Sequence, residues 1–111
     1  MGGAAIAGAA GVANFKHVIL NNGVHNSVGG MPTAGLRVSF TEIVKACGYT
    51  DAWHVERSEE LAEMVARPLS ARGPAMLEIM VRKGARSDLG RPKSSPIENK
   101  TAFTRFLSDL D

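Results

Sequence analysis

Three stretches of the chain have the apolar, partly β-branched pattern that is typical of buried strands. Residues 15–20 read FKHVIL and run into the polar turn Asn-Asn-Gly, which is a strong signal that a strand ends there. Residues 74–81, PAMLEIMV, are the second such run, and residues 51–56, DAWHVE, are a shorter one. The pattern therefore predicts three strands, well separated along the chain.

The segment 39–48 has the periodicity and the end signals of a helix. Ser39 is a suitable N-cap, and Glu42 three positions later completes a capping box. Gly48 supplies the stop signal at the other end. Cys47 falls on the apolar face of this helix, so it is better interpreted as a small buried side chain than as a nucleophile. The members of that face are Phe40, Ile43, Val44 and Cys47.

Three further helices are expected. Residues 57–73 form one, which Ser58 is expected to cap and which Pro68 is expected to end or kink just before its own position. Residues 1–12 are almost all Gly, Ala and other small or β-branched residues, which indicates a helix packed close to a neighbour. The last helix is expected to begin near Asn99. Its apolar face comprises Phe103, Phe106, Leu107 and Leu110.

The alternation of helices and strands predicts an α/β fold with an open, mainly parallel sheet and helices on both faces. Residues 1–111 are expected to form a single domain, with residues 82–98 as an irregular segment before the last helix. In such sheets ligands bind beyond the carboxyl ends of the strands. Asn21 and Asn22 lie at such an end, and the loop 21–37 that follows is long enough to indicate a functional role.

Composition and charge narrow the range of partners. The chain has 111 residues and a net charge of +2, which is too mild to indicate nucleic-acid binding. No run approaches the roughly 20 apolar residues of a membrane span. Cys47 is the only cysteine, so no intrachain disulfide forms, and this suits a cytoplasmic protein. We expect a cytoplasmic domain that contacts neither nucleic acid nor membrane.

The Asn pair has two interpretations. An Asn carbonyl oxygen is a neutral, hard donor that suits Mg²⁺ or Ca²⁺. Mg²⁺ sites usually include a carboxylate, however, and residues 1–41 contain no Asp or Glu. The other interpretation is that Asn21 and Asn22 cap the strand end and make turn hydrogen bonds. The residue types alone leave both interpretations open.

Other candidate residues likewise have both a functional and a structural interpretation. His25 is either a proton-transfer group or an exposed loop histidine, whereas His17 and His54 fall within predicted strands and are expected to be structural. Basic residues crowd the last third of the chain, which indicates either a local anion site or a solvated basic tail. These residues are Lys83, Arg86, Arg91, Lys93 and Lys100.

Three motifs carry a resemblance to a known family: HVILNNGVHNSVGGMPT at 17–33, VRKGARSDLGRP at 81–92 and PIENKTAFTRFL at 96–107. Together they resemble the carboxy-terminal domain of thiamine-diphosphate-dependent decarboxylases, over essentially the whole chain. The second of these motifs, VRKGARSDLGRP, is called the tail motif below. It resembles the corresponding segment of the branch whose members act on small 2-oxo acids that carry a second anionic group. It disfavours thiamine enzymes of the benzoylformate or acetolactate type.

In that family a Gly-Asp-Gly begins the cofactor motif and an Asn-Asn ends it. The resemblance implies that Asn22 binds Mg²⁺ through its side chain and Val24 through its backbone carbonyl. It also implies a catalytic position for His25 near the reacting centre, and it suggests Arg86 and Arg91 as contacts for the substrate anion or a neighbouring subunit. The implied cofactor-binding set is Asn21, Asn22, Gly23, Val24, His25 and Ser27.

The chain departs from the family pattern in two respects. It contains no Gly-Asp-Gly, and its first helix resembles the one that follows that motif, so we expect an amino-terminally truncated domain whose acidic motif lies upstream. Asn26 and Met31 stand where relatives usually have an acid and a glutamine. The pyrimidine-binding domain of these enzymes is expected to be a partner domain or subunit.

The resemblance implies a homo-oligomeric parent enzyme that decarboxylates a small anionic 2-oxo acid with thiamine diphosphate and Mg²⁺. This chain alone is expected to be inactive. The alternative is a non-catalytic α/β module for assembly or anion binding, which the missing Asp and Asn26 favour.

Overall fold

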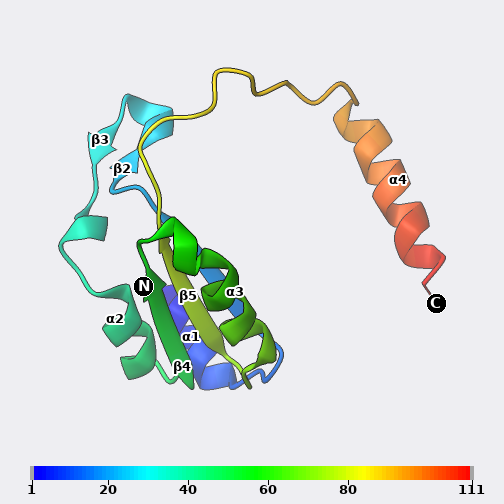
Figure 1. Cartoon of the computed structure of the whole chain (residues 1–111). Helices are drawn as coiled ribbons and strands as arrows, with labels where there is room; N and C mark the ends of the chain where they lie inside the picture. The colour runs from blue at the N-terminus through cyan, green and yellow to red at the C-terminus, as the bar shows by residue number, and fades with distance from the viewer. Residues whose placement is uncertain (1, 111) are drawn as a thin grey trace.

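A computed structural model describes residues 2–110 of the chain. Its central feature is a parallel sheet with the strand order β1-β5-β4 (Figure 1). The strands are β1 (Lys16–Asn21), β4 (Asp51–Val55) and β5 (Ala75–Met80). All three lie where the apolar runs predicted them, and the parallel α/β fold is confirmed.

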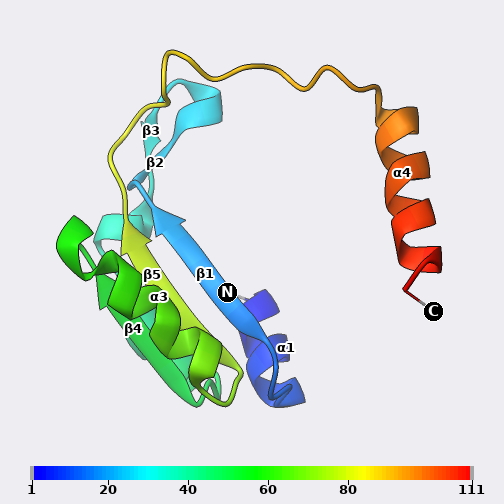
Figure 2. The ribbon, with the colours of Figure 1, turned by 45° about the vertical axis from the view of Figure 1, so that its right-hand side comes forward.

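Helices cover both faces of this sheet, as predicted. The helices α1 (Gly2–Ala10) and α2 (Phe40–Ala46) contact each other on one face. Helix α3 (Leu61–Ser70) packs on β4 and β5 from the opposite face (Figure 2). The core on the α1–α2 side is built around the buried residues Val44, Tyr49 and Met76, with Ala4, Ala7, Ile19, Phe40 and Ala52 packed against them.

The glycines of α1 allow it to approach α2 closely. A Cβ atom on Gly8 would lie 1.8 Å from the backbone oxygen of Cys47, at the carboxyl end of α2. No side chain fits in that space. The sequence prediction that this helix of small residues packs against a neighbour is therefore confirmed for residues 2–10, while Met1 lies outside the described residues.

The segment 21–37 is more ordered than the loop that the sequence predicts. It contains a short antiparallel hairpin of β2 (Val24–His25) and β3 (Met31–Pro32). It also contains two short 3₁₀ turns, η1 (Asn26–Val28) and η2 (Ala34–Leu36). The strands are so short that no alternating apolar pattern reveals them in the sequence.

Two details of the predicted helix ends are wrong. A 3₁₀ turn, η3 (Ser58–Glu60), precedes α3, and the Ser58 hydroxyl donates to Glu59 and does not cap the helix. Pro68 lies inside α3, so the predicted end before it is wrong and the helix continues to Ser70, whereas the alternative, a kink at this position, stays a prediction. Pro68 lacks the N–H that would bond to the carbonyl of Met64, and it is the buried residue of this helix, so its packing offsets part of that cost.

Residues 81–95 contain no helix or strand and lead away from the sheet to α4 (Pro96–Ser108) (Figure 1). This helix begins earlier than the predicted Asn99, because Ser95 and Glu98 form a complete capping box ahead of it. Its predicted apolar face is exposed to solvent in this chain. That face comprises Phe103, Phe106, Leu107 and Leu110. Among residues 2–110, no helix is long and apolar enough to cross a membrane.

Candidate functional site

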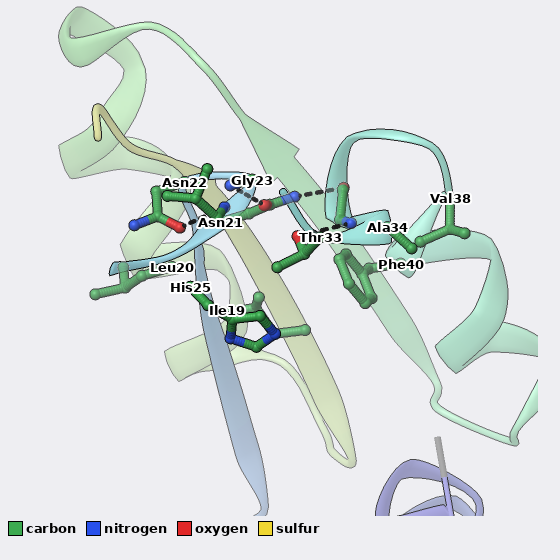
Figure 3. Close-up of a pocket in the computed structure, with 12 residues that line it drawn as sticks. Ile19, Leu20, Asn21, Asn22, Gly23, His25, Thr33, Ala34, Val38 and Phe40 are labelled. Atoms are coloured by element: carbon green, nitrogen blue, oxygen red, sulfur yellow. Dashed lines mark hydrogen bonds between the residues drawn. The ribbon is translucent and has the colours of Figure 1, made fainter. Parts of the chain in front are cut away.

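A pocket of about 390 Å³ opens where β1 ends and the 21–37 segment begins (Figure 3). Its position agrees with the rule that ligands of parallel α/β sheets bind beyond the carboxyl ends of strands. The segment folds back over the end of β1, so that η2 and the start of α2 form the opposite wall. The lining residues are Ile19, Leu20, Asn21, Asn22, Gly23, Val24, His25, Thr33, Ala34, Gly35, Val38 and Phe40.

Asn21 is the buried anchor of this pocket, with only 6% of its surface exposed. Its side-chain nitrogen donates to the carbonyl oxygen of Gly35 and to Oε1 of Glu78, each at 2.7 Å. Its side-chain oxygen accepts the N–H of Gly23 at 3.0 Å. Asn21 therefore makes turn hydrogen bonds, as one sequence interpretation expected, and it also ties the turn to the central strand β5.

Asn22 and Val24 lie together on one edge of the turn. The side-chain oxygen of Asn22 accepts the N–H of Val24 at 3.1 Å (Figure 3). Because the N–H and C=O of a strand residue point to the same edge, the Val24 carbonyl also points away from β3 and toward the side of Asn22. The β3 residue opposite Val24 is Pro32, which has no N–H to offer. Two neutral oxygen donors thus share one edge.

Gly23 makes this turn sterically feasible. Its φ of +71° lies in the left-handed region, which is costly for a residue with a side chain. Its N–H donates to the Asn21 side chain and its carbonyl oxygen accepts the N–H of Thr33 at 2.9 Å, so the turn is held on both sides of Gly23. The glycine therefore sets the positions of Asn22 and Val24 on either side of it.

The remaining predicted site residues differ in whether they line the Asn pocket. His25 lines the pocket from β2, with an exposed side chain, whereas Ser27 lies in η1 and is not part of the lining. Arg86 and Arg91 line a separate pocket of about 400 Å³ in the 81–95 segment. There Arg86 makes a two-pronged ion pair with Asp88, at 2.9 and 2.7 Å, which raises the pKa of Arg86 and lowers the pKa of Asp88. The two arginines are thus brought together, apart from the Asn pocket.

A polar network behind Asn21 was not anticipated from the sequence. Glu78 lies in the central strand and is only 4% exposed. Its second oxygen, Oε2, contacts Nδ1 of His54 at 2.9 Å, and Nε2 of His54 contacts Glu56 at 3.0 Å. The hydrogen bonds with Glu56 and then Glu78 raise the pKa of His54 above its ordinary value. His54 had been expected to be structural, and the signal that the sequence offered was a single acid within the apolar run of β5.

The donor set around the pocket suits a hard cation only in part. Asn22 and Val24 supply neutral oxygens of the kind that Mg²⁺ accepts. None of the residues that line the pocket is an Asp or Glu, and residues 2–110 contain no group of three or more His, Cys, Asp or Glu side chains arranged for a metal. The described residues thus supply only part of the ligand set that a Mg²⁺ site usually has.

Comparison with known proteins identifies the family of the chain. The family model described as "Thiamine pyrophosphate enzyme, C-terminal TPP binding domain" matches residues 1–79, which include β1, the Asn turn and nearly all of β5. A phosphonopyruvate decarboxylase of Streptomyces viridochromogenes is 33% identical over 108 residues, which cover 97% of this chain and 27% of that protein. A phosphonopyruvate decarboxylase of Streptomyces hygroscopicus is 34% identical over 96 residues, or 86% of this chain and 24% of that protein.

The chain therefore spans about a quarter of the length of the relatives that it matches. Their similarity extends beyond the family model into the tail, since 108 of the 111 residues align with the first of them. The observed fold and these matches agree. This chain belongs to the family of carboxy-terminal thiamine-pyrophosphate-binding domains of thiamine pyrophosphate enzymes.

Proposed function

We propose that this chain forms the Asn-bearing part of the Mg²⁺–diphosphate site of a decarboxylase that converts phosphonopyruvate to phosphonoacetaldehyde and CO₂. The observation that carries the proposal is the shared edge of Asn22 and Val24, where two oxygen donors flank a glycine turn at the end of β1. The names of the relatives supply the substrate. Thiamine diphosphate, when bound, supplies the electron sink for the loss of CO₂ from a 2-oxo acid.

Each residue has a distinct task in this proposal. Asn22 through its side chain and Val24 through its carbonyl hold Mg²⁺, while the turn from Gly23 to Ser27 lies along the diphosphate. His25, exposed at the pocket, is the candidate catalytic residue for proton transfer near the reacting centre. Arg86 and Arg91 bind the second anionic group of the substrate or a neighbouring subunit.

The proposal requires partners. The charged Mg²⁺ ligand and the pyrimidine-binding wall of the site come from another segment or subunit, and the working enzyme is a homo-oligomer. The exposed apolar face of α4 is consistent with burial in such an assembly. A chain with the single cysteine Cys47 suits the reducing cytoplasm. This chain by itself is expected to bind the cofactor weakly and to lack turnover.

Isothermal titration of the purified chain with thiamine diphosphate, with and without Mg²⁺, tests the proposal. We expect Mg²⁺-dependent binding that Asn22→Ala abolishes. Asn14→Ala is the matched control, because Asn14 is exposed in the turn before β1 and lines no part of the pocket. If the affinity for thiamine diphosphate is the same without Mg²⁺, or the same in Asn22→Ala, the result would favour the alternative, a non-catalytic α/β module for assembly or anion binding.

Substrate choice is tested in the assembled enzyme. Sulfopyruvate is the alternative substrate, because the tail motif also resembles the β subunit of sulfopyruvate decarboxylase. The two substrates differ in the anionic group, a phosphonate against a sulfonate. We expect faster release of CO₂ from phosphonopyruvate, and faster release from sulfopyruvate would reassign the substrate.

A further inference from the structure

The orientation of the Asn21 amide is determined by its neighbours. Its nitrogen lies between two groups that only accept hydrogen bonds, the Glu78 carboxylate and the Gly35 carbonyl. A flipped amide would place its oxygen against both acceptors and its nitrogen against the N–H of Gly23. Only one orientation satisfies all three contacts, and in that orientation the Asn21 oxygen holds the turn.

We propose that Glu78 is a positioning residue, whose buried carboxylate orients Asn21 and thereby fixes the turn that carries Asn22 and Val24. Insofar as that turn serves Mg²⁺ and a diphosphate, this inference rests on the proposed function. Glu78 itself lines no part of the Asn pocket, so it acts through Asn21. The predicted effect on a ligand is therefore indirect.

The place of Glu78 in the sheet suits this role. It lies on β5, the central strand, so its carboxylate reaches Asn21 on β1 with one oxygen and His54 on β4 with the other. Burying a carboxylate is unfavourable unless it is paired and hydrogen-bonded, and an apolar side chain would fill a central strand at lower cost. His54 is in turn held by Glu56, which keeps the imidazole ring beside Glu78. The arrangement therefore fits an acceptor for Asn21 better than a filler of the core.

Hydrogen exchange of two backbone amides separates positioning from general stability. The Gly23 N–H reports the turn, because it donates to the Asn21 side chain. The Ala75 N–H, which donates to the Phe15 carbonyl at the far end of the sheet, reports opening of the whole fold. In Glu78→Leu we expect exchange at Gly23 to rise about tenfold more than at Ala75.

The conservative variant Glu78→Gln should retain the protection of the Gly23 amide. In Glu78→Gln the introduced amide oxygen still accepts from Asn21, so exchange at Gly23 should stay within about threefold of the wild type. Asn21→Asp places a carboxylate against Glu78 and should raise exchange at Gly23 as Glu78→Leu does. Combining Asn21→Asp with Glu78→Gln swaps donor and acceptor, and it should restore part of the protection. A residue that only fills space predicts no such rescue.

Binding of thiamine diphosphate with Mg²⁺ gives the second readout. We expect Glu78→Leu to weaken it about tenfold, and Glu78→Gln and the control Glu56→Gln to leave it within about threefold. If the wild type does not bind, the proposed function fails, and the Gly23 exchange still decides the role of Glu78. Equal rises at Gly23 and Ala75, an unchanged Gly23 in Glu78→Leu, or wild-type binding by that variant would each overturn the inference.

Discussion

The side-chain nitrogen of Asn21 lies 2.7 Å from Oε1 of Glu78, although the two residues are 57 positions apart in the sequence. This contact joins the turn at the end of β1 to the buried centre of the sheet. A further bond carries the network to His54 on β4, so that a single set of polar contacts crosses all three parallel strands. The geometry of the turn thus depends on residues outside the pocket.

Gly35→Ala should disturb the side chain of Asn21, because the atoms nearest to an added Cβ are side-chain atoms. A Cβ atom at position 35 would lie 2.8 Å from the Asn21 side-chain oxygen and 3.0 Å from the Thr33 hydroxyl. Such overpacking typically costs about 1–3 kcal/mol. We expect a lower free energy of unfolding and faster hydrogen exchange at Gly23. The control is Gly90→Ala, where an added Cβ meets nothing within 4 Å. Equal effects of the two changes would contradict this account of Asn21.

Gly8→Ala should destabilise the whole domain. The added methyl group would meet the Cys47 carbonyl oxygen at 1.8 Å, and the backbone there cannot move aside without separating α1 from α2. The loss should exceed the helix propensity gained by replacing glycine, leaving a net cost of about 2 kcal/mol.

Gly3→Ala is the matched control on the same helix. Nothing lies within 4 Å of an added Cβ there, so this change should stabilise the fold by about 0.5–1 kcal/mol. Thermal unfolding followed by circular dichroism compares the two variants. A Gly8→Ala protein as stable as Gly3→Ala would show that the close contact between α1 and α2 is wrong.

The His54 network should make stability depend on pH. Both ring nitrogens face carboxylate oxygens, of Glu56 and of Glu78, and the pKa of His54 is raised in the folded chain. The folded state thus holds a proton more tightly than the unfolded state. The resulting stabilisation is complete below the ordinary histidine pKa of about 6.5 and is lost as pH rises through the raised folded value.

Melting temperatures of the wild type and of His54→Gln between pH 5.5 and 8.5 measure this effect. The wild type should exceed the variant most at the acidic end, and the difference should shrink toward the alkaline end. A difference that grows with pH would mean that His54 is neutral in the folded protein at all these pH values.

The sequence predicted the larger elements well because their signals are local. Three apolar runs became the three strands of the parallel sheet, and Ser39 caps α2 through the N–H of Glu42 as expected. The small-residue helix packs closely on its neighbour, as its glycines indicated. These features follow from periodicity, capping and side-chain size, which can be assessed within about a dozen residues.

The parts that the sequence did not predict depend on contacts between distant residues. Glu78 stood out only as a lone acid in an apolar strand, and nothing near it in the chain pointed to Asn21 or His54. The β2–β3 hairpin is too short for a pattern, and the tolerance of Pro68 inside α3 depends on the packing that buries it. Arg86 was a candidate anion contact, but its pairing with Asp88 two residues away reduces its availability.

The most direct test of the central claim replaces Mg²⁺ by the paramagnetic ion Mn²⁺ and records spectra of the ¹⁵N-labelled chain with thiamine diphosphate. If Asn22 and Val24 hold the metal, broadening should centre on the Asn22 side-chain amide and on the backbone signals of residues 22–25. It should vanish in Asn22→Ala and persist in Asn14→Ala. Broadening centred instead on His54, Glu56 and Glu78, or spread evenly over the chain, would contradict a metal site at the Asn turn.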